Sequence, residues 1–164
     1  MPASAGTISK EYQVKAVFLF NFAQFVQWPH TAFARADEPF QIGILGSDPF
    51  DGFLDDTVKG EKVDGHPLVI QRYASIGDVQ KCHILFISRS EDRKMADILA
   101  SLNGKDILTV GDTESFIKNG GIVRFFIGRD KIHLKINPQA AKRANLKISS
   151  KVLRLAELTK PGED

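Results

Sequence analysis

Short apolar runs alternate with amphipathic segments through the first two thirds of the chain. The apolar runs have the length of β-strands and cover residues 40–46, 67–73, 82–88 and 106–111. Helical patterns or turns fall between them, at residues 49–59, 75–80 and 91–102. The third apolar run shows no two-residue alternation, which is typical of a strand covered on both faces. Strands that alternate with helices predict βαβ units and a parallel sheet.

The last third of the chain follows a different pattern. Apolar runs at 121–127 and 131–136 flank the three residues 128–130, a connection that contains glycine and suits a hairpin. A helix is predicted at 138–144, with Asn137 as its cap. A last helix is predicted to begin at Ser149 or Ser150 and to turn these apolar residues inward: Val152, Leu153, Leu155, Ala156 and Leu158.

These patterns together predict an α/β fold. We expect a single three-layer domain with a mostly parallel central sheet, helices on both faces and a C-terminal antiparallel hairpin edge. The domain is expected to span residues 10–158. Residues 1–9 are expected to be a flexible N-terminus or the remnant of a signal peptide, because Ala3-Ser-Ala5 has the form of a signal-peptidase site. Residues 159–164 are expected to form a flexible tail.

The N-terminal segment 11–29 is apolar enough to resemble a membrane anchor, but polar residues interrupt it. On a helical wheel four of them fall within about 120° of one another, and Lys15 stands alone on the far side. This polar stripe consists of Gln13, Asn21, Gln24 and Gln27. A short segment with a recurring polar stripe predicts a helix buried on most sides, capped by Ser9 and ended by Pro29. The polar stripe is either the solvent face of the helix or a contact patch for a dimer or partner.

The charge of the chain is unevenly distributed. The 164 residues carry a net charge of only +2, but residues 1–117 hold 16 acidic and 11 basic residues, whereas residues 118–160 hold two acidic and 11 basic ones. This asymmetry indicates either an anion-facing surface or the solvated faces of a dipolar molecule. Nucleic acid is not an expected partner, because the basic segment contains few aromatic residues for stacking, and two of these, Phe125 and Phe126, fall in a predicted strand.

Two turns at the carboxyl ends of predicted parallel strands are candidate anion sites. Ser47 and Asp48 follow the first strand, where they serve either as a ligand cradle or as a helix cap. Arg89 follows the third strand, where a guanidinium suits a carboxylate or phosphate. Further cations that could contribute to a ligand site are Arg124, Lys151 and Arg154.

Other chemistry has little support in the sequence. Asp48, Ser88 and Asp112 could converge as acids do in phosphate-accepting domains, but the acidic pair that holds Mg²⁺ is missing. The four histidines show no metal-ligand spacing, and Cys82 fits a small core residue. We therefore predict no catalytic residue, no metal site and no cofactor.

Three segments together resemble the YfiR-like family of small bacterial periplasmic proteins. They are residues 12–29, residues 82–88, and the stretch from Gly120-Gly121 through Ile136-Asn137 to 146–156. The resemblance implies a periplasmic protein, secreted by a signal peptide, with no enzymatic activity. It would bind the periplasmic sensor segment of an inner-membrane diguanylate cyclase and restrain it, which lowers cyclic di-GMP signalling and biofilm formation.

The same resemblance implies further partners. It implies a homodimer, an outer-membrane lipoprotein that releases the restraint, and a small ligand such as a nucleotide or tryptophan. The best-described member is controlled through disulfides, whereas Cys82 has no partner within this chain, so redox control here would need an intermolecular bridge. The alternative function is a sensor of small anions, nucleotides or aromatic amino acids with a different membrane partner.

Overall fold

The computed structural model describes residues 9–158, in which eight strands form one curled sheet. The strand order is β10-β8-β7-β6-β5-β2-β4-β3. Neighbouring strands run parallel except in the pairs β7–β8 and β3–β4. The strands are β2 (Phe40–Leu45), β3 (Lys62–Val63), β4 (His66–Tyr73), β5 (Ile84–Ile87), β6 (Leu108–Gly111), β7 (Val123–Gly128), β8 (Lys131–Ile136) and β10 (Ala156–Leu158).

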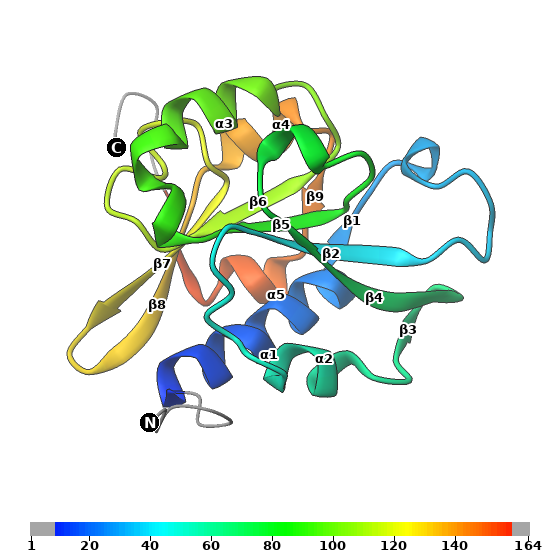
Figure 1. Ribbon diagram of the computed structural model, residues 1–164, viewed down its shortest axis with the longest axis horizontal. Helices are drawn as coiled ribbons and strands as arrows, with labels where there is room; N and C mark the ends of the chain where they lie inside the picture. Colours follow the sequence, from blue (N-terminus) through cyan, green and yellow to red (C-terminus); the bar gives the residue numbers. More distant parts are fainter. Residues whose placement is uncertain (1–8, 159–164) are drawn as a thin grey trace.

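Helices cover both faces of the sheet, as the three-layer prediction requires. Figure 1 shows α1 (Lys10–Phe25), α2 (Phe53–Val58) and α5 (Ser150–Leu153) on one face, with α3 (Met95–Ser101) and α4 (Pro138–Arg143) on the other. Short 3-10 helices occupy His30–Ala32, Ile76–Asp78 and Arg89–Lys94. The predicted fold class is therefore confirmed, with the antiparallel pair β7–β8 near the C-terminus. The predicted flexible ends lie outside the described residues, apart from Ser9, whose side chain caps α1.

Two apolar clusters hold the layers together. The larger one lies between α1 and the sheet and includes Leu19, Phe22 and Phe125. The smaller one lies under α3 and includes Leu85, Met95 and Phe116. Strand β5 is buried along its whole length and contributes to both clusters, which agrees with its lack of alternation.

The predicted last helix is wrong beyond its first turn. Helix α5 ends at Leu153, and Leu155, which was predicted to face inward, is 66% exposed. The chain then extends into β10, which pairs in parallel with β8 and lies beyond the hairpin at the sheet edge. The apolar spacing from 152 to 158 fits a helix, but hydrogen bonding to the open backbone of β8 favours a strand.

Helix α1 is also shorter than predicted. It ends at Phe25 instead of continuing toward Pro29, because Val26 and Gln27 form strand β1. This strand pairs with β9 (Lys147–Ile148) in a separate two-stranded ribbon. The helix is also less buried than predicted, since Val14 and Val17 are 40% and 45% exposed. No helix within residues 9–158 is long and apolar enough to cross a membrane.

Candidate functional site

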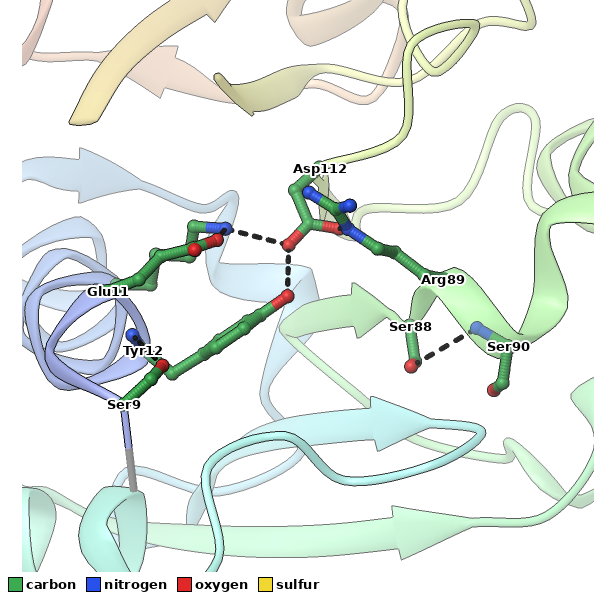
Figure 2. A network of polar contacts seen from close by, with 8 residues as sticks. Ser9, Glu11, Tyr12, Ser88, Arg89, Ser90 and Asp112 are labelled. Carbon is green, nitrogen blue, oxygen red and sulfur yellow. Dashed lines mark hydrogen bonds and ion pairs between the residues drawn. The ribbon is translucent and has the colours of Figure 1, made fainter. Parts of the chain in front are cut away.

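The carboxylate of Asp112 organises a polar network at the carboxyl end of β6. Its side chain is 1% exposed and receives three hydrogen bonds. Figure 2 shows Tyr12 and Arg89 pointing toward it from opposite sides. The donors are Tyr12 Oη at 2.7 Å, Lys15 Nζ at 2.8 Å and Arg89 Nε at 3.1 Å. We call these four residues the Asp112 clamp, because they join α1 to the ends of β5 and β6.

The local structure of α1 explains two of the donors. Tyr12 and Lys15 are three residues apart and therefore lie on one face of the helix. Ser9 fixes the first turn by accepting a hydrogen bond from the Tyr12 amide, and Glu11 forms an ion pair with Lys15 one turn later. The Lys15 side chain is 1% exposed and lies opposite the polar stripe, as its position on the helical wheel indicates.

Together with the adjacent Glu11, the clamp is electrostatically balanced. Lys15 and Arg89 face the carboxylates of Asp112 and Glu11, so two cations meet two anions. Burial would raise the pKa of Asp112, but hydrogen bonds from Lys15 and Tyr12 and the nearby cations outweigh it and hold that pKa below its usual value. Burial, and then the hydrogen bond to Asp112, raise the pKa of Tyr12. A phenol with a raised pKa keeps its proton and acts here as a hydrogen-bond donor to Asp112. The geometry is that of an ion-pair clamp.

Arg89 is the member of the clamp that solvent reaches. Its Nε is held by Asp112, but its side chain is 61% exposed, so the far side of the guanidinium faces outward. The next residue, Ser90, accepts a hydrogen bond from the Ser47 amide at 2.9 Å. The structure thus brings the predicted turns after β2 and β5 together, and ligand contact at Ser47 and Arg89 remains a prediction.

Asp48 is already engaged within the protein. One carboxylate oxygen accepts a hydrogen bond from the Phe50 amide at 2.7 Å, and the other lies 2.8 Å from Arg72 Nε. Arg72 also pairs with Asp55, and these contacts raise the pKa of its guanidinium. The geometry of Asp48 is that of a turn cap with an ion pair. Its role toward a ligand also stays a prediction.

The remaining predicted cations lie elsewhere. Arg124 is on β7, opposite Gly111 of β6 and Lys135 of β8, and its guanidinium lies 5.6 Å from the centre of the Phe126 ring. Arg154 is exposed at the end of α5. Lys151 is the one that the structure joins to the polar stripe, in a groove described next.

Two grooves follow the outer side of α1. The α1 groove, of about 440 Å³, is lined by Lys10, Gln13, Val14, Val17, Phe18, Asn21 and Phe53. The basic groove, of about 420 Å³, is lined by Gln24, Phe25, Gln27, Lys147, Ile148, Ser149, Ser150 and Lys151. The polar stripe is therefore divided between an apolar groove and a basic one. Its role in an interface remains a prediction.

The structure shows neither a reactive thiol at Cys82 nor a metal site within residues 9–158. Cys82 is 6% exposed, and burial raises the pKa of its thiol to about 12. An intermolecular bridge would therefore require this residue to be uncovered. Within residues 9–158, no three His, Cys, Asp or Glu side chains lie close enough together to hold a metal ion.

The centre of the clamp was not predicted from the sequence. Asp112 was considered only for convergence with Asp48 and Ser88, whereas its partners come from α1. The available signal was Lys15, because a lone lysine on the apolar side of a helix needs a buried carboxylate nearby.

Known proteins share both the sequence pattern and the fold of this chain. The family model described as YfiR/HmsC-like (DUF4154) matches residues 12–157. The chain belongs to the YfiR/HmsC-like family. None of the curated proteins matches this sequence. The match of this YfiR/HmsC-like chain begins at Tyr12, so it includes all members of the Asp112 clamp.

Two solved structures share the fold of this YfiR/HmsC-like chain. A conserved domain protein from Vibrio cholerae O1 biovar El Tor is 17% identical, with a TM-score of 0.52 over 73% of this chain and 54% of the other. An ABC domain from Streptococcus pneumonia, solved in complex with L-Trp, is 12% identical, with a TM-score of 0.53 over 73% of this chain and 55% of the other. The chain thus spans about half the length of each, and these identities show the fold alone.

Proposed function

We propose that this chain is a non-enzymatic regulatory protein of the bacterial periplasm. It binds the periplasmic sensor segment of an inner-membrane diguanylate cyclase and restrains the enzyme, which lowers cyclic di-GMP signalling and biofilm formation. The observation that carries the proposal is membership of the YfiR/HmsC-like family over residues 12–157. A homodimer and release by an outer-membrane lipoprotein belong to the same proposal.

The chemistry of the Asp112 clamp supports a binding role. The Asp112 clamp pairs its buried charges internally, and its phenol has a raised pKa. An acid–base catalyst requires a group whose pKa is matched to proton transfer near neutral pH, and the clamp is not arranged in that way. Its effect is to hold α1 firmly on the sheet.

The outer side of α1 is the surface that we assign to the cyclase. The α1 groove exposes Val14 and Val17, which are among the large apolar side chains most open to solvent. Apolar residues flanked by Gln13 and Asn21 give the mixture of apolar centre and polar rim that protein interfaces use. The basic groove continues this surface along the same helix.

The proposal is tested with the purified protein and a membrane-anchored diguanylate cyclase from the same bacterium. We expect the protein to bind the isolated periplasmic segment of that cyclase and to reduce cyclic di-GMP synthesis by the full-length enzyme in membranes. Val17→Asp is expected to weaken both effects, because it places a charge in the α1 groove.

Ile127→Asp is the matched control, since Ile127 is 55% exposed on β7 and does not line the α1 groove. It should leave binding and restraint unchanged. If the wild-type protein neither binds the segment nor lowers cyclase activity, the proposed function is wrong. If Val17→Asp and Ile127→Asp behave alike while the wild type binds, only the assigned surface is wrong.

A further inference from the structure

A cavity of about 290 Å³ lies between α3 and α4, on the face of the sheet away from α1 (Figure 1). Its lining is mixed, and its apolar side chains, which we call the floor, include Leu99 of α3, Ile107 just before β6, and Ile122 just before β7. Leu99 and Ile107 are largely buried, with 6% and 8% of their surface exposed, so the apolar contact area they offer is small. The cavity is near the lower end of the range of about 300–1,000 Å³ typical of ligand pockets, so an occupant would be small.

The rim of this α3–α4 cavity is positively charged. Lys105, in the turn after α3, and Arg143, in the last turn of α4, both line it, and no acidic residue does. Neither cation forms an ion pair within the described part of the chain. The neighbouring carboxylate of Asp106 is turned to Asn145, whose Nδ2 donates to it at 2.9 Å.

This rim also belongs to a wider imbalance. All ion pairs in residues 9–158 use basic residues from the first 89 positions, although the segment 118–160 holds 11 of the 22 Lys and Arg residues. Most exposed cations need no partner, because water solvates them. Arg143 differs from its neighbour Lys142 because Arg143 lines an apolar-floored cavity and Lys142 does not.

We propose that the α3–α4 cavity binds a small organic anion. The apolar body of the ligand lies on the floor formed by Leu99, Ile107 and Ile122. Its carboxylate or phosphate lies at the rim between Lys105 and Arg143, where a guanidinium can bind either group with two hydrogen bonds. The site is separate from the surface assigned to the cyclase, so it does not depend on the proposed function.

The test is calorimetric or NMR titration of the protein with four probes of related shape. Benzoate and phenyl phosphate carry both an anion and an apolar body, benzyl alcohol lacks the charge, and inorganic phosphate lacks the apolar body. We expect the two aromatic anions to bind more tightly than the other two probes and to shift the amide signals of α3 and α4. The order of benzoate and phenyl phosphate identifies the preferred head group.

Two variants of adjacent residues decide the role of the rim. Arg143→Gln should weaken binding of the preferred probe by about tenfold or more, as expected for the loss of a charge-assisted contact. Lys142→Gln removes the same charge one residue away and should leave affinity within about twofold. Affinity should also fall as salt is raised.

A third variant tests the floor. Ala140 lines the cavity from α4, and Ala140→Leu should abolish binding by filling the space. Should this variant fail to fold, Lys105→Gln supplies the second measurement. The inference is overturned if no aromatic anion binds, if benzyl alcohol binds as tightly as benzoate and phenyl phosphate, or if Arg143→Gln and Lys142→Gln weaken binding equally.

Discussion

The buried carboxylate of the Asp112 clamp is the part of the structure whose loss should cost most stability. Asp112→Ala removes the acceptor of all three hydrogen bonds at once. It leaves Lys15, which is 1% exposed, with Glu11 as its ionic partner. Removing one member of a buried ion pair typically costs about 3–5 kcal/mol. Here the loss falls on Lys15, which keeps only the partly exposed Glu11, and on the donors of Tyr12 and Arg89. For a domain of this size that cost corresponds to a fall in Tm of roughly 6–20 °C.

The measurement is urea unfolding followed by circular dichroism, with the slope of the transition compared among variants. Asp37→Ala is the matched control, because Asp37 pairs with Arg35 through side chains that are 84% and 69% exposed. An exposed pair contributes about 0–1 kcal/mol. If the two variants lose similar free energies of unfolding, the burial argument for the clamp is refuted.

A double-mutant cycle isolates the pair itself. Lys15→Met and Asp112→Asn each disturb the clamp, and Lys15→Met with Asp112→Asn removes both charges together. We expect the double variant to be more stable than the sum of the single effects predicts, by about 1 kcal/mol or more. The reason is that neither fully buried charge is left without its partner, and the charges that remain, Glu11 and Arg89, are 29% and 61% exposed. Simple additivity would show that Lys15 and Asp112 do not stabilise each other.

Three further predictions concern other parts of the fold. Burial lowers the pKa of His83, whose ring nitrogen accepts a hydrogen bond from the Gln41 amide. The free energy of unfolding should therefore fall as pH drops below about 6.5, because the unfolded chain takes up a proton there that the folded His83 resists. In urea titrations at several pH values, His83→Gln should flatten this dependence and His30→Gln should not. Because the pKa of Cys82 is raised to about 12, iodoacetamide at pH 8 should label the native thiol at least about a hundredfold more slowly than the unfolded one, and rapid native labelling would contradict its burial. Gly121→Ala should cost about 1–3 kcal/mol in thermal or urea unfolding, because its Cβ would lie 2.2 Å from the buried Phe116 ring, whereas Gly52→Ala has open space and should be neutral; equal effects would refute the packing argument.

The elements that the sequence predicted best are those whose signal is local. The run 82–88 lacks alternation because β5 is buried on both faces, and 131–136 alternates because β8 is covered on one. The hairpin between β7 and β8 was predicted, but its connection is Arg129-Asp130 alone instead of the expected 128–130, because Gly128 pairs with Lys131 at the end of β7. In each case the residues that decide the structure lie within the element itself.

The elements that failed depend on distant partners. The segment 156–158 has apolar residues that fit a helix, and only the open edge of β8 turns it into a strand. Val26 and Gln27 leave the helix because β9, more than 100 residues later, pairs with them. Patterns of apolar and polar positions do not contain this information, because pairing and register are set when the whole sheet assembles.

The candidate site was hidden for the same reason. Tyr12 and Lys15 lie 100 and 97 residues before Asp112, so no spacing rule connects them. The solvent-facing residues Ser47 and Arg89 could be predicted, because the carboxyl ends of parallel strands are where polar turns gather. The ion pair between Asp112 and Arg89 was not predicted, although both follow parallel strands, because Asp112 was weighed only as one of a group of acids.

Helix α1 carries both the buried clamp and the surface assigned to the partner. Tyr12 and Lys15 face the sheet, while Val14 and Val17, on the opposite side of the same turns, face the α1 groove. The buried ion pair therefore determines that Val14 and Val17 face solvent, because rotating the helix to expose Lys15 would bury both valines. The buried ion pair thus fixes one orientation of the helix, since any other orientation leaves the buried Asp112 without its partners Tyr12 and Lys15 from α1.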